Sequence, residues 1–119
     1  KLEACNKYSF PDLTIVCQKP IYEKSSQGLD ALLNPEIIVE VLSESTAAYD
    51  RTEKFDCYRT LPSFREYVLV SSDKKYVEVH KKLNEAEWLI HFYTEKDTTV
   101  QIGDCAIFLD DIYYAVEFE

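Results

Sequence analysis

A short apolar run, Ile37–Ser43, carries a carboxylate, Glu40, at its centre. The run is rich in β-branched residues and follows Asn34-Pro35, a pattern that favours a buried strand over a helix. Alternate side chains of a strand share one face, so Ile38, Glu40 and Leu42 should point the same way. Because burying an unpaired carboxylate is costly, Glu40 should be protonated, paired with a cation of the chain or bound to a metal ion.

The hydrophobic pattern along the rest of the chain predicts a mixture of strands and helices. The expected elements are a strand at residues 13–17, a long loop at 18–34, a helix at 50–61, strands at 66–71, 76–80, 87–93, 99–102 and 106–108, and a short helix at 109–116. From Glu66 onward the apolar period is two, which is typical of hairpins. One helix crossing a mixed, mostly antiparallel sheet is an α+β fold.

Two further places break local rules. Asp12 follows a proline at the mouth of the first strand, where the missing proline N–H is tolerated. Asp50 has the pattern of a helix cap, with Glu53 at the third helical position of a capping box. Lys54 then falls in the first turn, where a cation opposes the helix macrodipole by about 0.3–1 kcal/mol. Residues that break a local rule without evident gain are functional candidates, and these are Asp12, Glu40 and Lys54.

Composition and charge limit the function classes. A chain of 119 residues with 46% hydrophobic and 29% charged residues predicts one globular domain over residues 1–119. The net charge of −9 counts against simple nucleic-acid binding but permits a local basic patch or metal-bridged phosphate contacts. No run approaches the roughly 20 apolar residues of a membrane helix and no leader is visible, so a soluble cytoplasmic protein is expected. Because the chain has no methionine, we expect it not to begin at its own initiator.

The cysteines and histidines do not form a metal-binding pattern. They are Cys5, Cys17, Cys57, Cys105, His80 and His91. No Cys-x-x-Cys pair is present, and neither histidine has a partner at ligand spacing. The cysteines are therefore expected to be reduced packing thiols of a cytosolic protein, and the histidines are assigned no role.

Several blocks of the sequence, in this order, resemble one protein family. The blocks are Pro11–Val16, Val39–Thr46, Tyr49–Phe55, Leu61–Val70, Tyr76–His80 and Leu109–Tyr113. They closely resemble the Uma family of restriction endonucleases, which is widespread in cyanobacteria. The resemblance covers nearly the whole chain and implies a restriction-endonuclease-like fold of the PD-(D/E)xK type, in which two carboxylates and a lysine present a divalent metal to DNA.

The resemblance also implies roles for the three candidate residues. Asp12 matches the aspartate of the PD half-motif, Glu40 matches the acidic residue of the second half-motif, and Lys54 matches a lysine that has moved from the strand into the helix. The basic nuclease motif has its lysine two residues after the glutamate, where this chain has Leu42. Asp12 and Glu40 offer hard oxygen ligands for Mg²⁺, for which Mn²⁺ can substitute, and the Val41 carbonyl is a third. Related nucleases often act as dimers, so a homodimer is expected.

Other functions remain open. Family members usually carry a helix and strands ahead of the PD motif, with a further acidic residue, so we expect the N-terminal part of the family fold to be missing here. The first hypothesis is a Mg²⁺-dependent endonuclease with Asp12, Glu40 and Lys54 as catalytic residues. The alternative is a catalytically inactive nuclease-like module that binds nucleic acid or protein. A third possibility is a buried Glu40–Lys54 ion pair that only stabilises an unrelated small sheet.

Overall fold

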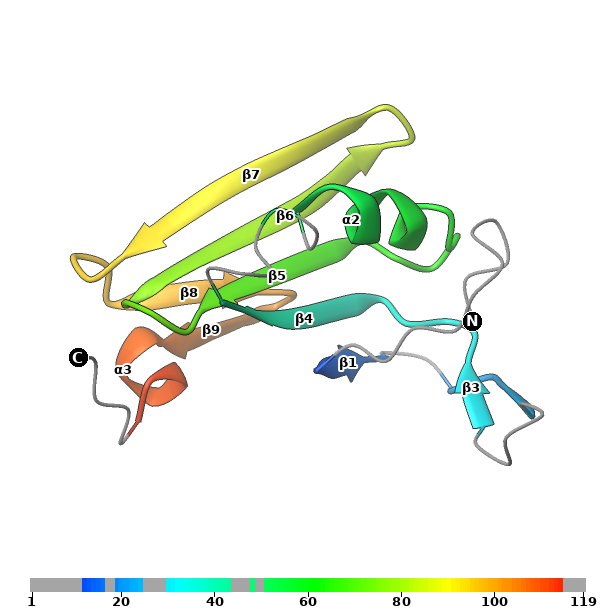
Figure 1. Ribbon diagram of the computed structural model, residues 1–119, viewed down its shortest axis with the longest axis horizontal. Coiled ribbons are helices and arrows are strands. Elements are labelled where there is room, and N and C mark those ends of the chain that lie inside the picture. Colours follow the sequence, from blue (N-terminus) through cyan, green and yellow to red (C-terminus); the bar gives the residue numbers. More distant parts are fainter. Residues whose placement is uncertain (1–11, 17–18, 25–29, 44–47, 49–50, 115–119) are drawn as a thin grey trace.

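The computed structural model describes residues 12–16, 19–24, 30–43, 48 and 51–114. Within these residues, five strands form one mixed sheet in the order β1-β4-β5-β6-β7 (Figure 1). The strands are β1 (Leu13–Ile15), β4 (Ile37–Leu42), β5 (Glu66–Ser71), β6 (Tyr76–Asn84) and β7 (Glu87–Thr94). β4 and β5 run parallel, and the other neighbours run antiparallel.

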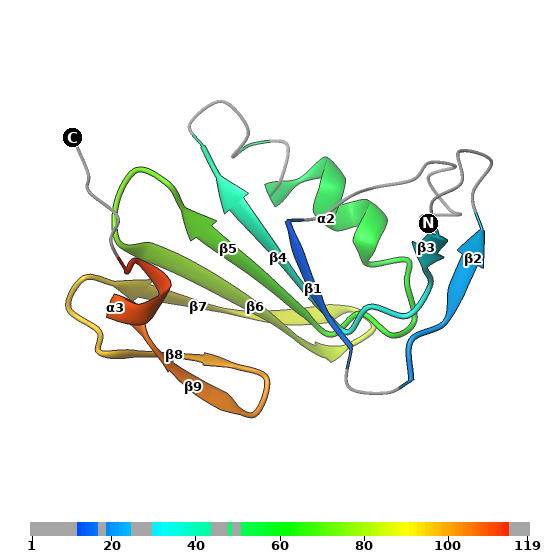
Figure 2. The same cartoon turned by 90° about the horizontal axis from the view of Figure 1, so that it is seen from below.

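The parallel pair requires a crossover, and α2 (Glu53–Tyr58) lies on this connection. Figure 2 shows α2 beside β4, against one face of the sheet. β4 contributes apolar side chains to a core on each face of the sheet, which is why its sequence is almost continuously apolar, although Val41 is exposed. The α+β fold with a mostly antiparallel mixed sheet and a crossing helix is confirmed.

Two small hairpins flank the main sheet. β2 (Tyr22–Lys24) pairs with β3 (Asp30–Leu32), so the prediction of a simple loop at residues 18–34 is wrong for these segments. β8 (Thr99–Ile102) pairs with β9 (Cys105–Phe108), and α3 (Leu109–Ile112) follows. The turn between β8 and β9 contains Gly103, whose φ of 58° favours glycine.

Each face of the main sheet has its own apolar core. The core under α2 consists of Ile38, Leu42, Tyr58, Phe64, Tyr67 and Leu69. The opposite core consists of Ile37, Val68, Val77, Val79, Tyr93, Val100, Ile102, Leu109 and Tyr113. Residues next to one another in a strand therefore belong to different cores, and the face under α2 is the one that carries Glu40.

The start of α2 differs from its prediction. Glu53 is the first helical residue, not the third, and α2 has six residues where about three turns were expected. Thr52 is the N-cap but makes no side-chain cap bond, because its hydroxyl donates to the Ala48 carbonyl at 2.6 Å. The capping-box position of Glu53 is therefore wrong, and the predicted cap Asp50 lies outside the described residues. Lys54 does lie in the first turn.

The expectation of reduced cysteines is wrong for Cys57. This residue is disulfide-bonded, whereas Cys105 is a free, exposed thiol. Composition indicates only the redox state that is expected of cysteines in a given compartment. It does not show which cysteines lie close enough to pair. In the described part of the chain, no helix has the length and apolar character needed to span a membrane. The single domain over residues 1–119 stays a prediction.

Candidate active site

Glu40 is buried on β4, the second strand of the sheet. Its exposed fraction is 3%, and β4 is paired with β1 on one side and β5 on the other. Its side chain shares the face under α2 with Ile38 and Leu42, which belong to the core there. The predicted burial of this carboxylate is therefore confirmed, and the carboxylate needs charge and hydrogen-bond partners.

Two side chains of α2 supply these partners. The Lys54 ammonium Nζ lies 3.1 Å from Glu40 Oε2, and the Tyr58 hydroxyl donates to Glu40 Oε1 at 3.1 Å. Lys54 and Tyr58 are four residues apart and so share one helix face. The sequence favoured core packing for Tyr58, and the structure adds this polar contact. Each carboxylate oxygen of Glu40 thus has a donor.

Asp12 reaches the same place from β1. Its Oδ2 accepts a hydrogen bond from the Val41 N–H at 2.8 Å. Leu13 pairs with Val39, so the residue before Leu13 lies beside the residue after Val39, which is Glu40. The N–H and C=O of one strand residue point to the same side of the strand, so the Val41 carbonyl points toward this edge as well.

The four residues predicted from the sequence therefore come together. They are Asp12, Glu40, Val41 and Lys54, and they come from the mouth of β1, from β4 and from α2. Asp12 is exposed whereas Glu40 is buried, so the site has a solvent-facing carboxylate and an interior one.

Opposing effects act on the pKa of the Glu40 carboxyl. Burial raises the pKa of the Glu40 carboxyl above its ordinary value, and the like charge of Asp12 adds to this rise. The hydrogen bond and charge of Lys54 and the bond from Tyr58 act against the rise without cancelling it. Lys54 alone therefore does not offset the effects of burial and of Asp12 on the Glu40 carboxyl, and a further positive charge nearby would stabilise its ionised form.

A divalent ion fits this donor set. The described residues contain no group of three or more His, Cys, Asp or Glu side chains that could hold a metal. Two carboxylates are nevertheless enough for Mg²⁺, which usually binds one or two protein carboxylates and keeps several water ligands. Asp12 and Glu40 are hard oxygen donors, and their mutual repulsion is what a cation between them would relieve.

A second buried carboxylate, Glu78 on β6, was missed by the sequence analysis. Leu69 pairs with both Glu40 and Glu78, so the two glutamates lie in one row across the sheet on the face under α2. Arg51 bonds Glu78 Oε2 through Nε at 2.9 Å and also through Nη2, and His80 Nε2 lies 3.3 Å from Glu78 Oε1.

His80 is buried with this pair. Burial lowers the pKa of His80 below its ordinary value, and the charge and bond of Glu78 act in the opposite direction. Glu78 and His80 alternate with Val77 and Val79, a pattern that normally indicates a solvent-facing side of a strand. Only knowing that α2 covers this face would have identified Glu78 as buried.

Comparisons with known proteins agree with this architecture. Residues 3–106 match the model of the Uma2 family, described as "Putative restriction endonuclease". Two relatives come from Synechocystis sp. (strain ATCC 27184 / PCC 6803 / Kazusa). Uncharacterized protein sll1609 is 37% identical over 70% of this chain and 46% of its own length. Uncharacterized protein slr1290 is 39% identical over 76% of this chain and 45% of its own length. The chain thus spans about half the length of these relatives.

A solved structure shares the fold. It is the crystal structure of a protein from Anabaena variabilis ATCC 29413, described as a "putative nuclease belonging to DUF820". The TM-score is 0.53 at 17% identity, over 76% of this chain and 51% of that protein. At this identity the match supports the fold only.

Proposed function

Since this chain belongs to the Uma2 family, whose description is "Putative restriction endonuclease", we propose that it is a metal-dependent endonuclease that hydrolyses DNA phosphodiester bonds. The observation that carries the proposal is the meeting of Asp12, Glu40 and Lys54 at one edge of the sheet, although they are far apart in the sequence. The net charge of −9 makes a bound cation the natural bridge between this site and a phosphate.

In this proposal Asp12, Glu40 and the Val41 carbonyl hold Mg²⁺. The ion, when bound, would supply Lewis-acid stabilisation of the phosphate and lower the pKa of an attacking water. Phosphodiester hydrolysis requires both, because negative charge builds up on the phosphate oxygens in the transition state.

Lys54 has two tasks in this scheme. It favours the ionised form of Glu40 when no cation is bound, since its ammonium acts against the rise in pKa that burial causes. The ammonium would also be placed to stabilise the charge that develops on the phosphate oxygens of a bound substrate. Tyr58 is a positioning residue, because its hydroxyl fixes the orientation of the Glu40 carboxylate.

Calorimetric titration with Mn²⁺ tests the metal site without a DNA substrate of known sequence. The wild-type chain should bind Mn²⁺, and Glu40→Gln should abolish binding because it removes the interior anionic ligand. Glu78→Gln is the matched control, since Glu78 is equally buried, lies on the same face and pairs with a cation, but is bonded to Arg51 rather than to Lys54. It should bind Mn²⁺ like the wild type. Undiminished binding by Glu40→Gln would refute the proposed site.

A second candidate function is an inactive nuclease-like module that binds nucleic acid or protein. The observation in its favour is that each carboxylate oxygen of Glu40 already has a partner within the chain, Lys54 for Oε2 and Tyr58 for Oε1. Absence of Mn²⁺ binding in both the wild type and Glu78→Gln would favour this function. A homodimer remains an expectation that analytical ultracentrifugation can test.

A further inference from the structure

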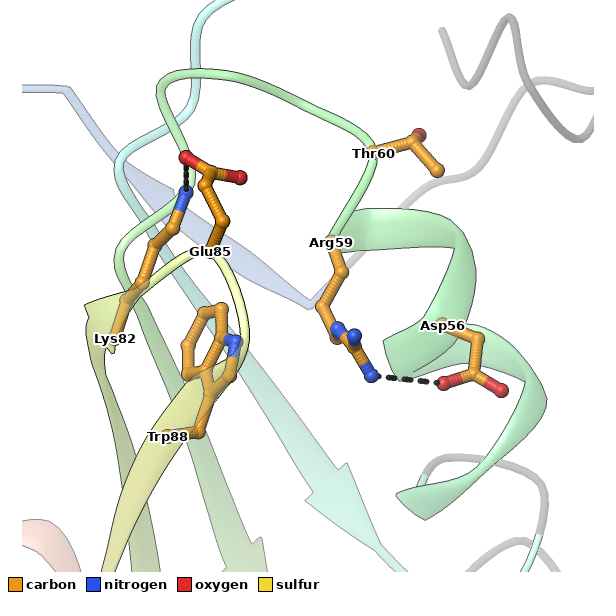
Figure 3. A pocket seen from close by; sticks show the side chains of 6 residues that line it. All are labelled: Asp56, Arg59, Thr60, Lys82, Glu85 and Trp88. Atoms are coloured by element: carbon orange, nitrogen blue, oxygen red, sulfur yellow. Dashed lines mark hydrogen bonds and ion pairs between the residues drawn. The ribbon is translucent and has the colours of Figure 1, made fainter.

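A cavity lies beside α2, on the side of β6 and β7. Its volume is about 270 Å³, and its lining comes from α2 and the turn after it, from β6, from the β6–β7 turn and from β7 (Figure 3). The lining residues are Asp56, Arg59, Thr60, Lys82, Glu85 and Trp88. We propose that this cavity binds one unpaired nucleotide of a nucleic-acid strand, with the base stacked on Trp88 and the phosphate bound by Arg59 and Lys82.

The indole of Trp88 is a supported stacking platform. Its ring lies 5.0 Å from the Phe55 ring and 5.3 Å from the Phe64 ring, measured between centroids. These two rings hold the indole from the core side, while its other side borders the cavity (Figure 3). A pre-positioned aromatic ring at a cavity wall suits a nucleobase, because every base has a π-face and stacking tolerates any sequence.

The two cations of the cavity have partners that they can exchange. Arg59 Nη1 lies 3.5 Å from Asp56 Oδ1, and Asp56 is 71% exposed. Lys82 Nζ lies 3.0 Å from Glu85 Oε1, and Glu85 is 92% exposed. Such exposed ion pairs contribute little to stability, so a phosphate can replace the carboxylate without loss.

The cations of the sheet face differ in this respect. Lys54 and Arg51 are paired with carboxylates that are only 3% and 5% exposed, and leaving either carboxylate unpaired would be costly. A phosphate that does not bring its own metal ion is therefore better received by Arg59 and Lys82. Figure 3 shows Lys82 and the indole of Trp88 on one wall and Arg59 on the facing wall.

The carboxylates at the rim predict a preference among bases. Once released, Asp56 and Glu85 can accept hydrogen bonds from an exocyclic amino group. Cytosine offers such an amino donor, whereas thymine offers a carbonyl acceptor at the same ring position. The two pyrimidines are alike in size, so a preference for oligo-dC over oligo-dT would report this contact. A base within a duplex cannot stack on Trp88, so duplex DNA should not fill the cavity.

This inference rests on the proposed function in taking the ligand to be nucleic acid, but it needs neither metal nor cleavage. Trp88 is the only tryptophan of the chain, so its fluorescence reports on this cavity alone. The experiment titrates the full chain with short oligo-dC, oligo-dT and a duplex in EDTA-containing buffer at low salt. Oligo-dC should quench Trp88 most, oligo-dT less, and the duplex should leave the fluorescence unchanged.

Variants that keep the fluorophore sharpen the test. Arg59→Ala or Lys82→Ala should weaken oligo-dC binding about tenfold, because each removes one charge-assisted phosphate contact. Each should also reduce the slope of log K against log salt by about 0.7. Lys75→Ala is the matched control, because Lys75 also pairs with an exposed carboxylate, that of Asp110, but lies outside the cavity.

The outcomes separate the two proposals. Unchanged Trp88 fluorescence with every oligonucleotide, or equal weakening by Lys75→Ala, would overturn the nucleotide cavity. If Mn²⁺ binds at Glu40 and no oligonucleotide changes the Trp88 fluorescence, the nuclease proposal stands and the nucleotide cavity does not. If oligo-dC quenches Trp88 and Mn²⁺ does not bind, the cavity stands and the metal-dependent nuclease fails.

Discussion

Replacing Lys54 by methionine tests the electrostatic account of the site most directly. Lys54→Met removes the ammonium from Glu40 and leaves an unbranched side chain that suits a helix. The side chains of Lys54 and Glu40 are 18% and 3% exposed, so solvent screens their interaction little. Removing one partner of a buried ion pair costs about 3–5 kcal/mol, because the other charge remains buried.

Protonation of Glu40 sets a ceiling on this loss. The ordinary pKa of the carboxyl is 4.5, so holding it protonated at pH 7 costs about 3.4 kcal/mol, at about 1.36 kcal/mol for each of roughly 2.5 pH units. The part of the loss that depends on pH cannot exceed this value, since the chain can take up a proton instead of burying the charge. We therefore expect Lys54→Met to lose about 3 kcal/mol of unfolding free energy at pH 7.

The sign of the pH dependence follows from the direction of the shift. Burial raises the pKa of Glu40 in the folded protein, and removing Lys54 raises it further. Between 4.5 and the raised pKa the folded state binds more protons than the unfolded state, so stability falls as pH rises. The stabilisation that comes from the raised pKa of Glu40 is fully present below pH 4.5. It is lost as the pH rises through the pKa that Glu40 has in the folded protein. The variant should therefore be closest to the wild type near pH 4.5 and fall furthest behind at neutral pH.

Urea unfolding followed by Trp88 fluorescence, at pH 4.5 and about pH 7, measures both quantities. Lys82→Met is the matched control, because the Lys82 side chain is 19% exposed but its partner Glu85 is 92% exposed. This variant should lose at most about 1 kcal/mol, with little change between the two pH values. Equal losses in the two variants, or a Lys54→Met loss that does not change with pH, would refute the reasoning.

Three further substitutions probe contacts around the site and the second hairpin. Tyr58→Phe keeps the buried ring but removes the donor to the site carboxylate, so urea unfolding should show a loss of about 1 kcal/mol; an unchanged midpoint would contradict this. Glu78→Gln removes the charge that raises the pKa of His80 against the effect of burial, so the NMR titration of His80 should move to lower pH; an unchanged His80 titration would contradict this. Gly103→Ala should lower Tm in a calorimetric scan by the equivalent of about 1–2 kcal/mol, because φ is +58° and the added Cβ would lie 3.2 Å from Ile37 Cδ1; an unchanged Tm would refute the strain.

The sheet was predictable because its sequence signals are local. β5, β6 and β7 follow from the period-two pattern after Glu66, and the turn at Gly103 follows from its glycine. β4 was identified because a strand buried on both faces is almost continuously apolar. The three candidate site residues were found for a related reason. Each breaks a local rule, and such breaks concentrate where function constrains the chain.

The parts that failed depend on contacts between distant segments. The start of α2 is an exception, because it involves a local contact: the Thr52 hydroxyl donates to the Ala48 carbonyl and makes no side-chain cap bond. Glu78 alternates with valines as a solvent-facing residue would, and its burial follows only from the position of α2 over the sheet. The bond from Tyr58 to Glu40 requires the helix to face β4, so the sequence could give only the helix face and not the partner.

The comparison between Glu40 and Glu78, the two buried glutamates on the face under α2, explains why one of them suits a metal and the other does not. Glu40 and Glu78 lie in one row under α2, and Lys54 and Arg51 supply a cation to each. Beside Glu40 lies a second carboxylate, Asp12, which adds to the need for positive charge. Beside Glu78 lies an imidazole, which is itself a hydrogen-bonding partner.

The excess of negative charge is therefore found at the Glu40 end of this row and not at the Glu78 end. In the Arg51–Glu78 pair, two guanidinium nitrogens donate to one carboxylate oxygen. This arrangement fixes both side chains and disfavours replacement of the guanidinium by a metal ion. The ammonium of Lys54 is a compact charge on a flexible stem and can give up its place to a divalent ion. Arg51, just before α2, thus closes the Glu78 site structurally, whereas Lys54 in the first turn of α2 leaves the Glu40 site exchangeable, which is what a cation-dependent site at Glu40 requires.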